Sequence, residues 1–135
     1  MVSKPKYKWW TYARNMIYDY PSLCRAHNES LRQKVTASYS GQPGGGEASR
    51  TTENTAVNTM SQNDYLEYDA VHSAIAQTKE SANGAGKINM IRLMYWARTH
   101  TLQGAAQAIH VSYATARRWH VAFVRKVGEN YGFFR

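Results

Sequence analysis

The sequence has few of the residues and runs that mark secreted or membrane proteins. Its one cysteine, Cys24, excludes an internal disulfide and a cysteine-based zinc site, which fits a reducing compartment. No apolar run approaches the roughly 18 residues that a membrane-spanning helix needs. The start, MVSKPKYKWW, is basic and has no apolar run behind it, so we expect no signal peptide. These absences predict a soluble intracellular protein with no membrane partner.

Patterns for catalysis, metals and cofactors are also missing. No two of the five histidines stand at the i, i+4 spacing of a helical zinc motif. The glycine runs at 44–46 and 84–86 lack the strand and the Gly-Lys-Ser/Thr ending of a phosphate-binding loop. No serine, cysteine or paired-carboxylate constellation stands out. We therefore expect a protein that is not an enzyme and holds no cofactor or metal.

Acidic residues are absent from a long C-terminal stretch. The net charge is +8, and no Asp or Glu occurs between Glu80 and Glu129. Residues 1–36 carry a net charge of +5, residues 37–81 of −4 and residues 82–135 of +7. A solvated surface usually mixes both signs, so an acid-free basic segment favours a polyanion such as nucleic acid as the partner. A fortuitously basic surface is the alternative.

Residues 101–127 have the pattern of a helix-turn-helix. Thr101 is a candidate N-cap for a short helix over 102–109, and Ser112 for a second helix that runs to about residue 127. Helical spacing places five residues on the core side of the second helix: Ser112, Ala116, Trp119, Phe123 and Val127. The opposite face carries Ala114, Arg117, Arg118, Val121 and Arg125. A small residue and three arginines on this face suit insertion into a DNA major groove.

The N-terminal third predicts a pair of helices, over 4–20 and over about 22–35. Pro21 separates them, because the residue before a proline is pushed away from helical geometry. Aromatic side chains are interleaved with Lys and Arg in the first helix. Two interpretations stay open: the aromatic rings stack on nucleic-acid bases, or they pack against a partner helix.

The middle of the chain changes composition twice. Residues 37–60 are rich in Gly, Ser, Thr and Asn and predict a flexible linker. Ser61 and Asp64 resemble a capping box that opens a helix over 62–80. The apolar stripe expected on this helix consists of Tyr65, Tyr68, Val71 and Ile75. A turn over 81–86 then leads to an apolar helix over 87–98, which fits the first helix of a three-helix core.

The sequence therefore predicts an all-α fold in three parts. These are an N-terminal helical pair in 1–36, a flexible Gly/Ser linker in 37–60 and a C-terminal helix-turn-helix domain in 61–135. Aromatic residues in the tail, from residue 128 onward, imply docking onto the body of the protein or onto another subunit.

The helix-turn-helix motifs resemble a known family. THTLQGAA at 99–106, followed by Ser112, Thr115-Ala116 and Arg118-Trp119-His120, is similar to the phage late transcriptional regulators of the RinA/ArpU type. Weaker motifs match at 9–10, 20–21, 39–50, 68–71 and 95–96, so the resemblance covers nearly the whole chain. It implies a helix-turn-helix like that of sigma-factor region four, and activation of phage or prophage late genes in the cytoplasm of a bacterial host. A third function, compatible with this one, is a protein-interaction module whose N-terminal aromatic helices bind RNA polymerase or another factor.

The resemblance also maps a DNA-contacting surface onto this chain. The recognition positions are Ser112, Tyr113, Ala114, Arg117 and Arg118. Paired donors make the two arginines candidates for guanine contacts, whereas Ser112 has a competing role as the cap. Thr101 and Gln103 are expected to meet backbone phosphate, and Arg125 to add a non-specific contact.

A DNA-packaging component such as a small terminase subunit is the alternative function. Proteins of that class also combine a helix-turn-helix with helical oligomerisation segments. Double-stranded DNA is the expected partner in both cases, and a homo-oligomer is possible in both. A ring of many subunits favours packaging, whereas a monomer or dimer favours regulation.

Overall fold

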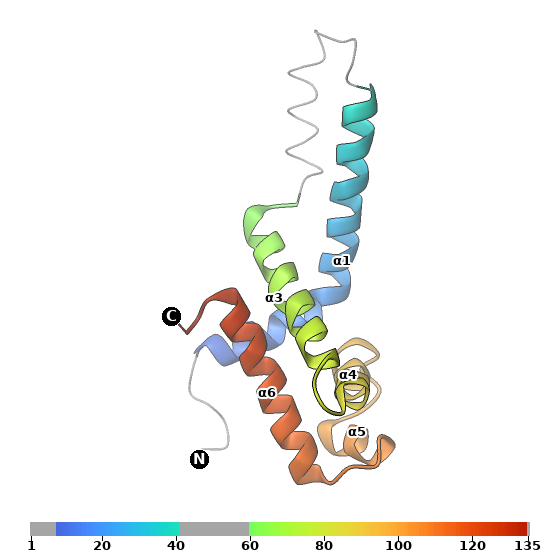
Figure 1. The fold of residues 1–135 in the computed structure, drawn as a ribbon, viewed down its shortest axis with the longest axis vertical. Coiled ribbons are helices and arrows are strands. Elements are labelled where there is room, and N and C mark those ends of the chain that lie inside the picture. Colours follow the sequence, from blue (N-terminus) through green and yellow to red (C-terminus); the bar gives the residue numbers. More distant parts are fainter. Residues whose placement is uncertain (1–7, 41–59, 135) are drawn as a thin grey trace.

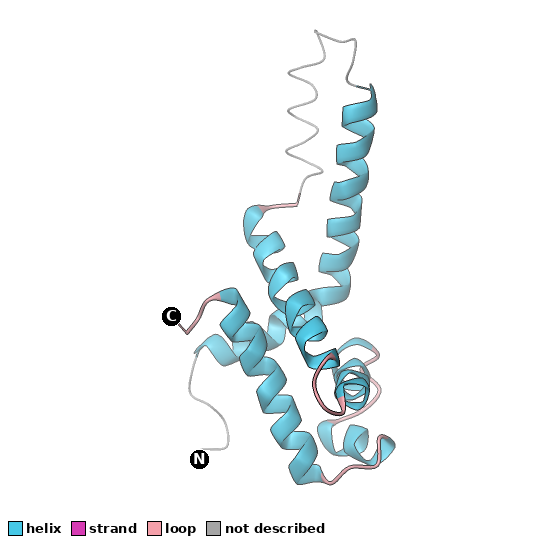
Figure 2. Cartoon of the chain, in the orientation of Figure 1, coloured by secondary structure: helices cyan, strands magenta, loops and turns pink. Residues whose placement is uncertain are grey.

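The computed structural model describes residues 8–40 and 60–134, with side-chain surroundings given for 8–32 and 60–134. Every regular element in this part of the chain is a helix, as Figures 1 and 2 show, so the all-α prediction is confirmed. In chain order the elements are α1 (Lys8–Ser40), α3 (Gln62–Lys79), α4 (Gly84–Ile91), the π-helix η1 (Arg92–Trp96), α5 (Leu102–Ala108) and α6 (Tyr113–Tyr131).

The N-terminal helical pair was a wrong prediction, because α1 continues through Pro21 as one helix. A proline inside a helix removes one hydrogen bond and bends the axis, but it does not end the helix when packing holds both sides. Buried residues lie on both sides of the proline, with Met16 and Ile17 before it and Leu23 after it. Figure 1 shows that the first part of α1 runs across the other helices before α1 turns and projects away from them.

The linker predicted for 37–60 is described only at its edges. Residues 37–40 form the end of α1, and Met60 and Ser61 lead into α3. Residues 41–59 lie outside the described residues, so the flexibility expected there stays a prediction.

Helix α3 begins as the sequence predicts. The Ser61 hydroxyl accepts a hydrogen bond from the backbone N–H of Asp64 at 3.0 Å, which is the N-cap half of the predicted capping box. The buried face consists of Ala70, Val71, Ala74 and Thr78. Of the predicted stripe, Val71 is therefore buried and Ile75 packs against the core, whereas Tyr65 does not fit the prediction. Tyr65 is 46% exposed. The helix packs its small residues, not this tyrosine, against the core.

Two features of the segment 84–98 differ from prediction. The helix begins at Gly84, inside the expected turn, because glycine lets its backbone sit against the last carbonyls of α3: an added Cβ would lie 2.5 Å from the Thr78 oxygen. The last turn is a π-helix, in which the N–H of Ala97 donates to the Arg92 carbonyl at 2.8 Å. Tyr95 in this turn is fully buried.

One hydrophobic core joins all of these helices. Buried residues from α1 (Ala13, Met16, Ile17), α3, α4, α5 and α6 (Phe123, Val124, Val127) pack in a single cluster. Trp9 at the start of α1 packs on Gly128 of α6, where an added Cβ would come within 3.2 Å of its ring. The first part of α1 is therefore part of the platform that carries α6.

The tail docks onto the body of the protein, as the sequence predicts. Helix α6 runs to Tyr131, past the end expected near residue 127, and Gly132 terminates it in a left-handed conformation (φ 110°). The Phe134 ring then lies 4.7 Å from the Trp9 ring, and Phe133 lies 5.6 Å from Tyr12.

Three connections in the described C-terminal half are turned by residues other than glycine in the left-handed region. Asn83 (φ 60°) lies between α3 and α4, Arg98 (φ 55°) between η1 and α5, and His110 (φ 64°) between α5 and α6. Residues with a Cβ are uncommon in this region.

Candidate nucleic-acid interface

Helices α5 and α6 each begin at a side-chain cap. The Thr101 hydroxyl accepts a hydrogen bond from the N–H of Gly104, and the Ser112 hydroxyl accepts one from the N–H of Thr115, each at 3.1 Å. Both N-cap predictions are confirmed. Ala105, Ala106 and Ala116 are fully buried where α5 meets α6, so small residues let the two helices approach closely.

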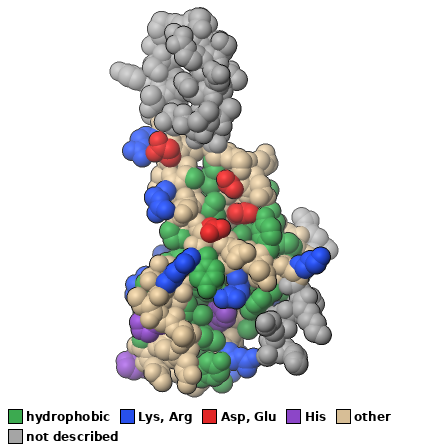
Figure 3. Space-filling view, turned by 180° about the vertical axis from the view of Figure 1, so that it is seen from behind, with side chains coloured by type: hydrophobic (Ala, Val, Ile, Leu, Met, Phe, Trp, Pro, Cys, Tyr) green, Lys and Arg blue, Asp and Glu red, His purple; other side chains and the backbone are tan. Residues whose placement is uncertain are grey.

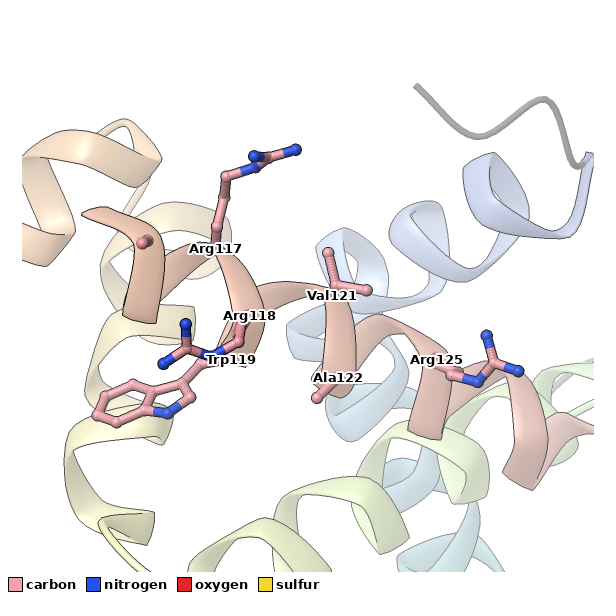
Figure 4. Close-up of a pocket in the computed structure, with 7 residues that line it drawn as sticks. Arg117, Arg118, Trp119, Val121, Ala122 and Arg125 are labelled. Atoms are coloured by element: carbon pink, nitrogen blue, oxygen red, sulfur yellow. The ribbon is translucent and has the colours of Figure 1, made fainter. Parts of the chain in front are cut away.

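Helix α6 presents the predicted outer face. Ala114, Arg117, Arg118, Val121 and Arg125 are all exposed, whereas Ala116, Phe123, Val124 and Val127 are buried. Figure 4 shows the exposed residues along one side of the helix, where they line a shallow groove. The division into a buried and an exposed face is therefore what helical spacing predicts.

The three arginines on this face differ in how they are held. Arg117 extends away from α6 in Figure 4 and has no ion-pair partner among the described residues. Arg118 donates to the hydroxyl of Thr115 at 3.3 Å. Arg125 stacks on the Phe134 ring at 4.9 Å and lies 3.7 Å from the carboxylate of Glu129. The pair is exposed on both sides, so it binds Arg125 only weakly.

The remaining predicted contact residues lie at the starts of the two helices. Thr101 and Gln103 are exposed in the first turn of α5, and Ser112 is exposed at the start of α6. Tyr113 is 49% exposed. The hydroxyl of Ser112 also donates to Thr115 at 3.0 Å, so it is occupied within the cap.

Two of the residues that line the groove, Ala122 and Trp119, lie outside the predicted outer face. Ala122 shares the outer face with Ala114 and Arg118, at the i, i+4 spacing that could have identified it. Trp119, which was expected in the core, packs against it but stays half-buried and also lines the groove. The ammonium of Lys87 from α4 lies over the Trp119 ring, 5.6 Å from the ring centre. This contact joins two separate helices, and the sequence does not indicate it.

Acidic side chains are unevenly distributed on the face shown in Figure 3. They lie in the upper part of the described portion, together with some Lys and Arg, while the lower part shows Lys, Arg and His side chains without acidic ones. This agrees with the absence of Asp and Glu between Glu80 and Glu129, the segment that contains α4, α5 and most of α6. A polyanion therefore meets little repulsion there.

A buried polar chain supports α6 from behind. The guanidinium Nε–H of Arg14 donates to the Tyr95 oxygen at 3.0 Å, so the Tyr95 O–H is left to donate to Nε2 of His120 at 2.7 Å. Burial, with a smaller effect from the charge of Arg14, lowers the pKa of His120 to about 4. Burial also raises the pKa of Tyr95 to about 12. His120 is therefore a neutral acceptor that ties α6 to η1 and α1.

Searches of protein-family models, of curated proteins and of solved structures find no match to this chain. Within the described residues, no helix combines the length and the apolar character required to cross a membrane.

Proposed function

We propose that this protein is a sequence-specific, double-stranded-DNA-binding transcription regulator whose helix α6 enters the major groove. The observation that carries the proposal is the outer face of α6, where Arg117 and Arg118 stand exposed on a helix capped by Ser112. Arginine in this position reads guanine through two parallel hydrogen bonds. Arg117 and Arg118 are the base-reading residues, with Tyr113 and Ala114 beside them.

The starts of α5 and α6 supply backbone contacts in this proposal. Thr101 and Gln103 meet a phosphate, and Arg125 adds a further non-specific contact farther along α6. The motifs shared with phage late regulators support activation of phage or prophage late genes, with RNA polymerase as a protein partner in a bacterial cytoplasm. The role is binding, without catalysis, metal or cofactor.

Selection of bound oligonucleotides from a random pool tests the proposal, followed by affinity measurements on the recovered duplex. We expect Arg117→Ala and Arg118→Ala each to weaken binding by about 1–3 kcal/mol and to relax the preference at one base pair. Arg32→Ala is the matched control, because Arg32 pairs with Glu29 on α1. Recovery of no preferred sequence, or full affinity in both variants, would contradict the proposal.

A DNA-packaging subunit of the small-terminase kind is the second candidate. It is favoured by the projecting part of α1, which Figure 1 shows extending beyond the other helices and which carries Leu31 at 49% exposure. A ring assembly would cover such an extension. The mass in solution separates the two functions, because a ring of many subunits indicates packaging and a monomer or dimer indicates regulation.

A further inference from the structure

Two arginines from distant parts of the chain meet at one tyrosine. The guanidinium of Arg98 lies 4.8 Å from the centre of the Tyr18 ring, and that of Arg14 lies 5.7 Å from it. Arg14 also donates to the Tyr18 hydroxyl at 3.3 Å. Arg14 and Tyr18 belong to α1, whereas Arg98 lies in the connection from η1 to α5.

No carboxylate balances these two charges within the described residues. The ion pairs found there are Arg32–Glu29 and Arg125–Glu129. Asp19, beside Tyr18 on α1, is exposed and pairs with neither arginine. Burial would lower the pKa of Arg14, but its hydrogen bonds to the hydroxyls of Tyr95 and Tyr18 and its electrostatic interaction with these two groups raise it. The pair therefore has unused N–H donors and an unbalanced positive charge, which suits an anion.

The backbone at Arg98 adds a second observation. Its φ of 55° is a conformation that glycine adopts without strain and that a residue with a Cβ rarely adopts. The chain nevertheless carries a long cationic side chain at this position, and the left-handed backbone accompanies its stacking on Tyr18. Such strain concentrates at binding sites.

The arginine pair lies against the helix-turn-helix. Tyr95 links Arg14 to His120 of α6: its hydroxyl lies 3.0 Å from Nε of Arg14 and 2.7 Å from Nε2 of His120. His120 follows Arg117 by about one helical turn. Arg98 precedes Thr101, the cap of α5, by three residues. The pair is consequently beside both helices of the motif, at the junction with α1.

We propose that Arg14 and Arg98 bind a backbone phosphate of the DNA that flanks the major-groove contact of α6. This inference rests on the proposed function and assigns α1 a part in DNA binding. Arg98, stacked on Tyr18, presents its remaining donors to the phosphate, and Arg14 supplies the second charge while it stays bound to Tyr95.

The salt dependence of the dissociation constant tests the phosphate contact. The variant is Arg98→Gly, since glycine relaxes the left-handed backbone and removes the guanidinium, and its melting temperature verifies the fold. Each phosphate contact contributes about −0.9 to the slope of log K against log salt. We expect the slope to become shallower by about 0.9 in Arg98→Gly and to stay near the wild-type value in Arg98→Lys. Arg25→Ala removes one exposed charge elsewhere on α1 and should leave the slope unchanged.

A duplex with one neutral methylphosphonate at each flanking position in turn identifies the phosphate. One substitution should weaken the wild type and leave Arg98→Gly unaffected. Two outcomes would overturn the phosphate contact even though the wild type still binds its sequence. Either Arg98→Gly and Arg25→Ala show equal salt slopes, or no methylphosphonate position weakens the wild type more than Arg98→Gly. Saturable binding of inorganic phosphate alone, lost in Arg98→Gly without any change in DNA affinity, would assign the site to a free anion and also overturn it. Failure of the wild type to select a sequence would instead refute the proposed function.

Discussion

The indole N–H of Trp96 donates a hydrogen bond to the backbone carbonyl of Ile17 at 2.7 Å, across 79 residues of sequence. Ile17 lies four residues before Pro21, so its carbonyl is the one whose partner within the helix the proline removes. The indole replaces that missing donor. A helix that the sequence alone would end at Pro21 can therefore continue, because a residue from η1 completes its hydrogen bonding.

The replacement can be tested with a double-mutant cycle. Trp96→Phe should lower the free energy of unfolding by about 1–3 kcal/mol, since it leaves the buried Ile17 carbonyl without a donor. In a Pro21→Ala background the N–H of residue 21 can serve that carbonyl, so the same substitution should cost clearly less. Urea unfolding of the four proteins measures the coupling. Identical losses in both backgrounds would show that Trp96 contributes packing alone.

The buried His120 should make stability depend on pH. Its pKa is lowered to about 4 in the folded protein, against 6.5 for an ordinary histidine. The unfolded chain therefore binds a proton between pH 6.5 and 4 that the folded chain does not, and stability must fall as pH falls through this range. The loss attributable to His120 is about 3 kcal/mol. It is absent in His120→Phe, and chemical denaturation at pH 7, 5.5 and 4.5 compares the two proteins.

Two glycines should respond oppositely to alanine. Gly84→Ala places a Cβ 2.5 Å from the carbonyl oxygen of Thr78, and we expect it to destabilise the fold by about 1–3 kcal/mol. Gly104→Ala meets nothing nearer than the Thr101 hydroxyl at 3.4 Å, so its higher helix propensity should stabilise by up to about 1 kcal/mol. Thermal unfolding of both variants measures the contrast. A destabilised Gly104→Ala would mean that α5 has less room than the structure indicates.

The two roles of Ser112 can be separated by substitution. Asn and Asp cap helices about as well as Ser, so Ser112→Asn and Ser112→Asp should both keep the melting temperature, whereas Ser112→Ala should lose about 1 kcal/mol. Only the aspartate places a negative charge at the start of α6. We expect it to weaken DNA binding on the order of tenfold, with the asparagine variant near the wild type. Equal DNA affinity in the Asn and Asp variants would place this end of α6 away from the duplex.

Local features were predictable from the sequence because the residues that cause them are neighbours. Ser61, Thr101 and Ser112 each bond to an N–H three residues on, and the outer face of α6 follows from helical spacing. The sequence-specific roles of Arg117 and Arg118 stay predictions. What spacing cannot give is any contact whose partner is distant in the chain.

The predictions that differ from the structure all involve a partner that is distant in the chain. Pro21 was expected to end a helix because Trp96 is far away, and Tyr65 was expected inside because periodicity does not say which side a neighbouring helix covers. Trp119 packs against the core as expected, but the position of Lys87 from α4 over its ring could not be read from spacing. The meeting of Arg14 with Arg98 at Tyr18 likewise exists only once α1 has packed against η1.

The left-handed residues Asn83, Arg98 and His110 have a consequence for the thermodynamics of recognition. A residue with a Cβ occupies a narrow energy well at positive φ. The backbone of each of these connections can therefore vary less in φ and ψ than it could with glycine at the same position. We therefore expect the orientation of α5 relative to α6, which the corner at His110 joins, to change little when a ligand binds. Whatever this motif docks onto, little conformational entropy should be lost from these corners on association, and binding should resemble that of a preorganised rigid surface.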